Sequence, residues 1–290
     1  MTADATLLRP LPRRRRSALF MPASNPRAVE KARQLPCDVV ILDLEDAVAP
    51  DRKVAARDTA VAALAAGGFG GRELVVRVNA GDTVWAAADL AALAAAPVDA
   101  VLLPKVGSVA DVATARARIG ADGPALWAMI ESARGLLALP ALADAAEGLG
   151  LTALVAGTND LAIDLSCRPD TARTPLLPAL AQIVAGARAG GMAALDGVLN
   201  VTDDAERLAA ECAQGAMWGF DGKTLIHPAQ IATANTAFGP DPETLEWARR
   251  VIALFADPAT ADRGAVAMDG AMVERLHLEQ AERIVAMADG

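Results

Sequence analysis

Short apolar runs alternate along the chain with longer segments rich in Ala, Leu, Arg and Glu. The apolar runs favour buried strands, whereas the longer segments between them favour helices. Strand–helix alternation predicts a parallel sheet, and eight such units within residues 1–238 predict an α/β fold of the closed (β/α)8 type, a TIM barrel. The eight runs are Ser17–Met21, Asp38–Leu42, Leu74–Val78, Ala100–Leu103, Leu126–Ile130, Ala153–Ala156, Ala193–Leu195 and Ala216–Trp218.

An open, doubly wound sheet is the alternative architecture for the same alternation. Its dinucleotide-binding form places a G-x-G-x-x-G loop directly after a strand, and none of the predicted strands is followed by one. The glycine-rich stretch at residues 67–71 precedes the third apolar run. We therefore interpret it as a helix-to-strand loop and not as a phosphate-binding loop.

The pattern changes after residue 238. A Pro- and Gly-containing loop leads into a predicted helix at Glu243–Phe255, a turn-rich stretch at Asp257–Gly270 and a last predicted helix at Met272–Ala288. We expect this C-terminal segment, residues 239–290, to be a helical appendage too short and too interrupted to build its own core. It would dock on a barrel as a lid or as a static cap. The last helix has an apolar stripe at Val273, Leu276, Ile284 and Ala288.

The charge is unevenly distributed. The 290 residues carry 27 Lys and Arg against 36 Asp and Glu, yet the first 33 residues hold eight basic side chains and two acidic ones. The acidic remainder argues against nucleic-acid binding. No apolar segment approaches the roughly 20 residues of a membrane span. We interpret the Arg13–Arg16 run as part of a solvated leader in which Arg16, next to the first strand, has a role in the site. A targeting or RNA-binding element is the alternative.

The cysteine and histidine content limits the kinds of metal site. Cys37, Cys167 and Cys212 are widely separated and form no C-x-x-C motif, which fits a reducing cytoplasm and no structural zinc. Because His227 and His277 are the only histidines, a metal ion would be held mainly by carboxylates. Such ligands favour Mg²⁺ or Mn²⁺ over zinc.

Charged side chains follow the predicted strands at their carboxyl ends, the edge at which (β/α)8 enzymes place their chemistry. Alternation along the second strand puts Asp43 and Glu45 on the same face as Ile41. Buried carboxylates are costly unless paired or bound to a cation, so we predict a divalent cation site with an arginine for a substrate carboxylate or enolate. The predicted mouth has the acids Asp43, Glu45, Glu131, Asp160 and Asp196 and the bases Arg77, Lys105 and Lys223.

Other reaction types fit the sequence less well. The chain has no G-x-S-x-G nucleophile elbow and no H-E-x-x-H zinc motif, and Pro228 follows His227, which makes an awkward triad partner. A Schiff-base mechanism through Lys105 or Lys223 stays open. The cluster of carboxylates favours metal-stabilised enolate chemistry.

Eight short motifs are spread over the chain. They are R-S-A-L-F-M-P from residue 16, D-L-E-D-A-V from 43, R-V-N from 77, L-P-K-V from 103, I-E-S-A-R-G from 130, G-T-N-D-L from 157, L-D-G-V from 195 and G-K-T-L-I-H-P-A-Q-I from 222. With these motifs the chain resembles the citrate lyase β-subunit-like proteins of the HpcH/HpaI aldolase superfamily, relatives of malyl-CoA and citramalyl-CoA lyases. The resemblance runs from about residue 14 to residue 288 and is only weakly specific for the substrate.

The resemblance implies a Mg²⁺-dependent carbon–carbon lyase that forms a homotrimer or hexamer. Its metal ligands would be Glu131 and Asp160. Asp43 and Glu45 would position metal-bound waters, and Arg77 would grip the 2-oxo acid and stabilise the enolate.

The resemblance also implies a binding region for the acyl-CoA in the basic N-terminal part of the chain. Arg16, Asn25, Arg27 and Lys31 are its expected residues. Lys105 is a further candidate for binding the substrate.

Two places depart from the family pattern. Pro22-Ala23 stands where relatives have Pro-Gly, and Glu274 and Leu276 stand where the family's lid motif has Asp and Pro. The lid Asp acts in the site of a neighbouring subunit. We expect Glu274, a longer carboxylate, to act there as the acid or base.

The preferred function is reversible cleavage of a 3-hydroxyacyl-CoA thioester, of the malyl, citramalyl or citryl type, into an acyl thioester and a 2-oxo acid. Three alternatives stay open. They are a pyruvate-type aldolase acting on free hydroxy-oxo acids, a thioester hydrolase, and an accessory subunit of a citrate lyase complex. We expect no nucleic-acid or membrane partner, and the acyl group is not identified by the sequence.

Overall fold

The computed structural model describes residues 13–289, which form two compact units. The larger unit is residues 15–238. The smaller one contains the C-terminal segment from Gly239 together with Arg13 and Arg14. Each unit has its own apolar core, so each is described separately below.

The larger unit is a closed barrel of eight parallel strands, which confirms the predicted TIM barrel. The strands follow one another in sequence order, and β1 closes the ring by pairing with both β2 and β8. The strands are β1 (Ser17–Pro22), β2 (Val39–Asp43), β3 (Glu73–Arg77), β4 (Ala100–Leu103), β5 (Ala125–Ile130), β6 (Leu151–Ala156), β7 (Ala193–Asp196) and β8 (Gly222–Leu225).

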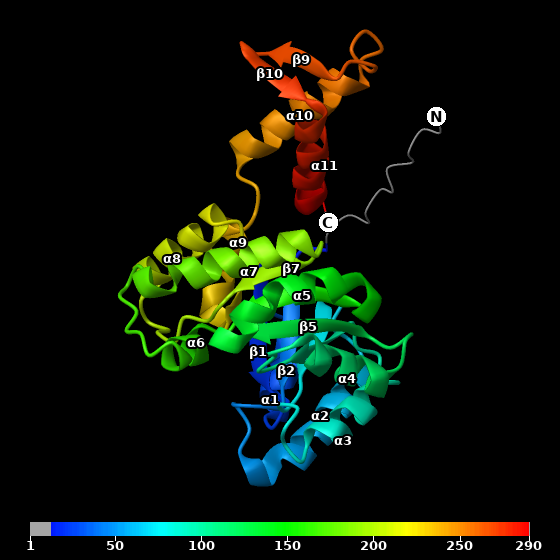
Figure 1. Cartoon of the computed structure of the whole chain (residues 1–290), viewed down its shortest axis with the longest axis vertical. Coiled ribbons are helices and arrows are strands. Elements are labelled where there is room, and N and C mark those ends of the chain that lie inside the picture. Colours follow the sequence, from blue (N-terminus) through cyan, green and yellow to red (C-terminus); the bar gives the residue numbers. More distant parts are fainter. Residues whose placement is uncertain (1–12, 290) are drawn as a thin grey trace. The chain divides into compact units, whose positions relative to one another are not determined.

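Helices follow the strands and surround them on the outside (Figure 1). The helices of this unit are α1 (Pro26–Ala32), α2 (Lys53–Ala66), α3 (Ala86–Leu93), α4 (Val109–Ile119), α5 (Ala133–Leu149), α6 (Thr158–Asp164), α7 (Leu177–Ala189), α8 (Ala205–Met217) and α9 (Ile231–Ala237). Short 3-10 turns occur at Pro50–Arg52, Thr174–Leu176 and Pro228–Gln230. Residues 67–71 lie between α2 and β3, as predicted.

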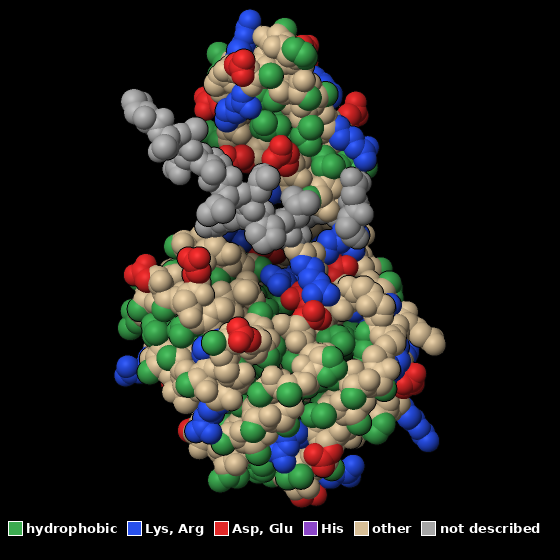
Figure 2. Space-filling view, turned by 90° about the vertical axis from the view of Figure 1, so that its right-hand side faces the viewer, with side chains coloured by type: hydrophobic (Ala, Val, Ile, Leu, Met, Phe, Trp, Pro, Cys, Tyr) green, Lys and Arg blue, Asp and Glu red, His purple; other side chains and the backbone are tan. Residues whose placement is uncertain are grey.

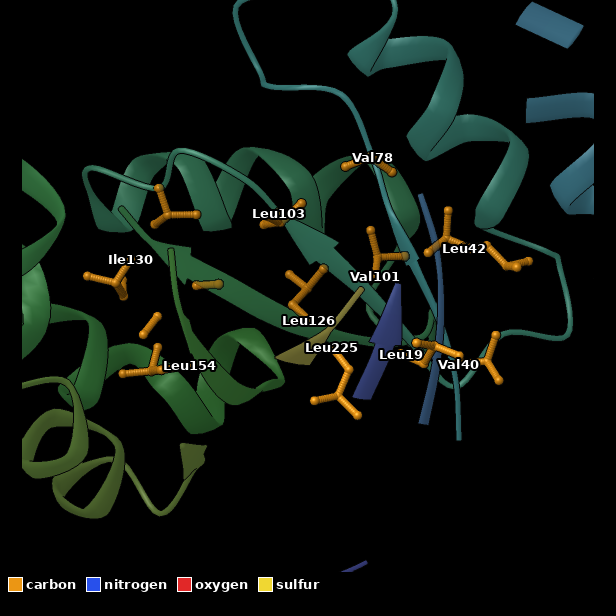
Figure 3. Packing of buried hydrophobic residues seen from close by; sticks show 14 of the residues in the cluster. Leu19, Val40, Leu42, Val78, Val101, Leu103, Leu126, Ile130, Leu154 and Leu225 are labelled. Atoms are coloured by element: carbon orange, nitrogen blue, oxygen red, sulfur yellow. The ribbon is translucent and has the colours of Figure 1, made fainter. Parts of the chain in front are cut away.

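Apolar side chains pack on both faces of the barrel wall. One set, which includes Leu19, Val40 and Leu126, lies between the strands and the surrounding helices (Figure 3). The alternate residues, such as Ile41 and Val75, fill the barrel interior. Because side chains alternate along a strand, the inward rows continue at the carboxyl ends of β2, β3 and β5 into Asp43, Arg77 and Glu131.

The eighth strand differs from the prediction. Residues 216–218, predicted as a strand, complete α8 and the turn after it, and their large apolar side chains are not buried, with Met217 78% exposed. Gly219, with a φ of 93°, follows, and the strand begins at Gly222. A Cβ on Gly222 would lie 1.9 Å from the carbonyl oxygen of Arg15, so only glycine fits there. Lys223 therefore lies in the first half of β8 and not at the mouth of the barrel.

The amino-terminal end of the barrel is closed by ion pairs. Arg15 donates hydrogen bonds of 2.7 and 2.8 Å to Glu73, and its guanidinium lies 5.0 Å from the centre of the Trp127 ring. Arg16 pairs with Asp38 through two bonds of 2.8 Å. The expectation of a solvated leader is therefore wrong for Arg15, and Arg16, which was expected to act in the site, is held by Asp38 at this end of the barrel.

The C-terminal unit consists of two helices and a hairpin: α10 (Pro242–Ala256), β9 (Ala265–Met268), β10 (Ala271–Glu274) and α11 (Arg275–Asp289). The hairpin occupies part of the predicted turn-rich stretch and takes in residues 272–274, which were predicted as helix. Ala248, Val251, Phe255, Val273, Ala281 and Ile284 form a buried cluster. The expectation that this segment lacks a core is thus wrong, and Leu276, 58% exposed, is not part of the apolar stripe.

None of the helices in residues 13–289 has the length and apolar character needed to cross a membrane. On the face shown in Figure 2, acidic and basic side chains are interspersed over the barrel unit.

Candidate active site

Asp43 and Arg77 form the centre of the candidate site. They are register partners at the carboxyl ends of the adjacent strands β2 and β3, and both side chains point into the barrel. Arg77 Nε donates to Asp43 Oδ1 and Arg77 Nη2 donates to Asp43 Oδ2, each over 2.7 Å. A bidentate pair of this kind fixes the plane of the guanidinium.

The edge of Arg77 that Asp43 does not occupy faces two more acids. Its Nη1 lies 3.1 Å from Glu45 Oε2 and donates to Asp46 Oδ2 over 3.1 Å. Phe20 of β1 lies against the guanidinium, with 4.7 Å between the ring centre and Cζ. Burial acts to lower the pKa of Arg77, but the bonds to Asp43 and the neighbouring carboxylates raise it overall. Arg77 is therefore a permanent cation in this site.

The loop after β2 is held from both sides. Asp43 accepts backbone N–H bonds from Glu45 and Ala47, at 2.9 and 3.1 Å. The buried Lys53 donates to the carbonyls of Leu44 and Glu45, at 3.0 and 2.8 Å. Sequence reasoning missed Lys53 as well as Asp46 and Phe20. Asp46 is part of the D-L-E-D motif and could have been found there. No sequence pattern around Lys53 indicates that its side chain folds back onto the loop after β2.

Glu131 ends the inward row of β5 and is 5% exposed. Its Oε1 accepts the backbone N–H of Lys105 over 2.6 Å. Lys105 has a φ of 53°, a strained conformation for a residue other than glycine, and this aims its N–H at the carboxylate. The other side of Glu131 lies against Gly157, where a Cβ would be 2.6 Å from Oε2. The G-T-N-D-L motif thus begins with a glycine because the Glu131 side chain occupies that space.

Asp160 and Lys105 complete the group of charges. Asp160 lies in the first turn of α6, and its charge is close enough to Glu131 to raise the pKa of that carboxyl. The Lys105 side chain is 53% exposed, and its Nζ lies 3.9 Å from Glu45 Oε1. The predicted residues Asp43, Glu45, Arg77, Lys105, Glu131 and Asp160 therefore share one region at the carboxyl ends of the strands.

Two carboxylates of this region have strongly raised pKa values. Burial, with the like charges of Asp46, Glu131 and Asp43 added, raises the pKa of Glu45 to about 8 in spite of Arg77. Burial is also the main cause that raises the pKa of Glu131 to about 7. In addition, Glu45 Oε2 is buried and has no well-aligned hydrogen-bond donor. A bound cation would stabilise the charged form of such buried carboxylates.

The donor set fits a hard divalent ion. Carboxylate oxygens suit Mg²⁺, which keeps several positions for water or substrate oxygens. Within residues 13–289, no three His, Cys, Asp or Glu side chains converge closely enough to make a complete metal site by themselves. Glu131 and Asp160 would therefore supply two ligands and leave the remaining positions open.

Several predicted residues lie elsewhere. Arg16 is at the opposite end of β1 from α1, so it does not form one patch with the three residues of the α1 region. Asn25 caps α1 by accepting the N–H of Ala28, while Arg27 and Lys31 are exposed on that helix, at the mouth end of β1. Glu274 is the exposed last residue of β10, in the C-terminal unit.

Asp196 and Lys223 were expected among the charges of the mouth, and this expectation is wrong. Both are fully buried on the outer side of the wall, where they belong to a separate cluster. The reason is the alternation of side chains: Leu195, not Asp196, points into the barrel at the end of β7.

The chain is similar to known proteins over most of its length. A family model described as HpcH/HpaI aldolase/citrate lyase matches residues 16–228. A protein of Cereibacter sphaeroides named (3S)-malyl-CoA thioesterase is 45% identical over 274 residues, which cover 94% of each chain. The citrate lyase subunit beta of Escherichia coli is 32% identical over 297 residues, with 99% of this chain and 97% of that protein covered.

A solved structure shows that the fold is similar as well as the sequence. The CitE protein of Mycobacterium tuberculosis, in complex with magnesium, acetoacetate and coenzyme A, matches with a TM-score of 0.73 at 35% identity, covering 94% of this chain and 98% of that one. The family model covers well over half of the residues and both protein relatives match almost the whole chain. This chain therefore belongs to the HpcH/HpaI aldolase/citrate lyase family of enzymes.

Proposed function

We propose that the protein is a Mg²⁺-dependent carbon–carbon lyase that cleaves a 3-hydroxyacyl-CoA thioester of the malyl type into an acyl-CoA and a 2-oxo acid. The observation that carries this proposal is the fixed Arg77–Asp43 pair beside Glu45 and Glu131, two buried acids with raised pKa values. A site of this kind binds a small acid and a cation together. Similarity to a CitE protein bound to magnesium and coenzyme A supports the choice of metal and thioester.

The residues have distinct roles in this proposal. Glu131 and Asp160 would hold the ion, which when bound acts as a Lewis acid and a template for the oxo-acid half of the substrate. Asp43 occupies one edge of Arg77, so the substrate would bind at the Nη1 edge. A carboxylate or developing enolate oxygen would there replace Asp46 as the acceptor of the Nη1 hydrogen bond. Asp43 and Glu45 would orient waters around the ion, and the Lys105 ammonium adds positive charge at the mouth.

Cleavage requires two proton transfers. The 3-hydroxyl loses its proton as the carbon–carbon bond breaks, and the released carbon of the acyl thioester takes one up. Glu45 is assigned to the first transfer, because its buried Oε2 has no well-aligned hydrogen-bond donor and lies 3.1 Å from Arg77 Nη1, the group proposed to bind the substrate. We assign the second to Glu274 of a neighbouring chain in a homotrimer or hexamer.

Arg27 and Lys31 are proposed to bind the phosphates of the CoA. Both are exposed on α1, which follows the carboxyl end of β1. Asn25 keeps the first turn of this helix in place. Arg16 is not included, because Asp38 occupies its guanidinium at the other end of the strand.

Thioester hydrolysis is the second candidate. It is favoured by the 45% identity to a protein named (3S)-malyl-CoA thioesterase. The same site would bind the hydroxyacyl group, but water would attack the thioester carbonyl and free CoA would leave.

Product analysis with malyl-CoA and Mg²⁺ distinguishes these functions. A lyase releases acetyl-CoA and glyoxylate, whereas a hydrolase releases free CoA and malate. A protein that splits free hydroxy-oxo acids equally well would be a pyruvate-type aldolase. Absence of turnover on malyl-, citramalyl- and citryl-CoA and on free acids would favour an accessory subunit and contradict the proposal.

A further inference from the structure

Four charged side chains form a buried cluster behind the barrel wall, outside the candidate site. Asp196 at the end of β7 and Lys223 of β8 are 0% exposed, and Glu211 of α8 and Arg173 before α7 are each 5% exposed. Arg173 Nη1 donates to both oxygens of Asp196 over 2.7 and 2.8 Å, and Lys223 Nζ lies 3.1 Å from Glu211 Oε1. The two positive and two negative charges balance.

Stability alone does not account for this cluster. Burying paired charges removes their hydration, and an apolar set of the same volume is commonly as stable or more stable. Buried ion pairs can instead specify one arrangement of the backbone around them. The question is therefore which backbone segment these four side chains hold.

The cluster holds Gly197, the first residue after β7. Asp196 Oδ1 accepts the N–H of Gly197 over 2.8 Å, and Lys223 Nζ donates to the Gly197 carbonyl. Both polar groups of this residue are thus bonded to members of the cluster. The loop that continues from Gly197 is fixed again further on, where Gln230 donates to the carbonyl of Leu199 over 3.1 Å.

This loop lies directly against the first turn of α6. A Cβ on Gly197 would be 2.4 Å from Thr158 Oγ1, so the loop and α6 touch at that point. Beside it, Asn200 exchanges two hydrogen bonds with Asn159, of 2.9 and 3.3 Å. The loop therefore contacts the two residues that immediately precede Asp160.

We propose that Arg173, Asp196, Glu211 and Lys223 are positioning residues, which fix the loop from Gly197 to Asn200 against α6 and thereby set the place of the Asp160 carboxylate beside Glu131. The proposal rests on the proposed function in that Asp160 is taken as a metal ligand. Groups that orient a metal ligand without touching the metal commonly change its affinity by 10–100-fold when removed.

The hydrogen bonds between Asn200 and Asn159 are exposed, so they can be removed with little effect on the fold. Asn200→Ala removes both bonds to Asn159 at an exposed position, so the melting temperature should stay the same. The affinity for Mn²⁺ alone, measured by the EPR signal of the free ion, should fall about 10-fold. Glu206→Gln, at an exposed position on α8, is the control, and its Mn²⁺ affinity should match that of the wild type.

The buried cluster is tested by a charge-balanced double variant. Lys223→Met with Glu211→Gln removes one charge of each sign and the bond to the Gly197 carbonyl. Thr224→Val is the matched control. Thr224 lies next to Lys223 on β8 and is equally buried, and the change deletes its hydrogen bond to the Asp196 carbonyl. The double variant should weaken Mn²⁺ binding about 10-fold and speed amide hydrogen exchange in residues 158–164, and the control should do neither.

The outcomes separate the two proposals. If the wild type binds no Mn²⁺, or Glu131→Gln leaves binding unchanged, the proposed metal site is wrong, and the exchange rates of residues 158–164 still test the positioning. Unchanged exchange and affinity in both Asn200→Ala and the double variant would overturn the positioning role. Equal losses in the double variant and Thr224→Val would also overturn it, because the cluster would then be only structural.

Discussion

The Arg77 guanidinium meets the Asp43 carboxylate through two parallel hydrogen bonds of 2.7 Å, with both side chains buried. The pair joins two neighbouring strands and turns the Nη1 edge of Arg77 toward Glu45 and Asp46. An anion that enters the barrel mouth therefore meets a cation that is already oriented. This arrangement requires the planar shape of arginine.

Replacing Arg77 by lysine should reduce turnover strongly, although the positive charge is retained. Lysine retains the charge but cannot bind Asp43 through two donors while presenting a third to the substrate. We expect a loss on the order of 10²-fold in kcat/KM, as for removal of a preorganised donor. Arg188→Lys is the control, since Arg188 forms a similar two-pronged pair with Asp221 before β8. Near-normal turnover in Arg77→Lys would place Arg77 outside the reaction.

Removal of either proposed metal ligand should abolish divalent cation binding. Glu131→Gln and Asp160→Asn keep the size of the side chains but remove the negative charge that the ion needs. Calorimetric titration with Mg²⁺ should show no binding in either variant, and activity should be absent. Asp144→Asn, an exposed carboxylate on α5, should bind Mg²⁺ normally. Full activity in excess chelator would contradict this prediction.

The metal-free protein should become less stable as the pH rises from about 5 to about 8. Glu45 and Glu131 have ordinary pKa values of 4.5, and in the folded protein these rise to about 8 and about 7. The folded state therefore binds more protons than the unfolded state across this range, and its stability falls until both groups are ionised. Thermal melts in chelator should show a decrease on the order of 10 °C.

Two controls check the origin of this pH dependence. Glu45→Gln should give a shallower decrease, because one of the two groups no longer titrates. Saturating Mg²⁺ should flatten it further, because the ion favours the charged carboxylates. A melting temperature that rises between pH 5.5 and 8 in chelator would show that these two acids are ionised without cost in the folded protein.

Charge removal on α1 should weaken binding of the CoA thioester. Arg27→Ala with Lys31→Ala should raise the KM for the thioester about 10-fold at low salt, and less at high salt because screening already weakens the attraction. The affinity for a free 2-oxo acid should stay the same. Arg16→Ala is the informative comparison: it should lower stability by breaking the pair with Asp38, without changing the KM. Equal effects on thioester and free acid would favour the free-acid aldolase.

Glu274→Gln should lower kcat at least 10-fold without changing Mg²⁺ binding, if this side chain is the acid or base of a neighbouring site. Glu279→Gln, an exposed change on the following helix, is the control. Mixed oligomers of Arg77→Lys and Glu274→Gln chains should regain part of the activity, because some sites would then combine an intact barrel with an intact Glu274. Normal turnover in Glu274→Gln would remove it from the site.

The sequence alone determined the fold class and most of the charged residues of the mouth. Strand–helix alternation is a local property and was sufficient to predict the barrel. Period-2 alternation placed Asp43 on the inward face of the second strand, and Arg77 and Glu131 were predicted at the mouth because they follow strands. The motifs also identified the family. The prediction of one barrel strand was wrong. Residues 216–218 were taken as the eighth strand, because a short apolar run in an Ala-rich helix has the same local pattern as a buried strand.

The tertiary structure decided which charges act together. Arg16 and Lys223 have the same sequence signal as Arg77 and Lys105, namely a base beside an apolar run. Only the register of the strands and the packing of α8 show that Arg16 pairs with Asp38 at the opposite end and that Lys223 lies buried with Asp196. Contacts such as Lys105 N–H to Glu131 join residues far apart in the chain. Long-range contacts of this kind have no periodic pattern, so they could be found only once the barrel had closed.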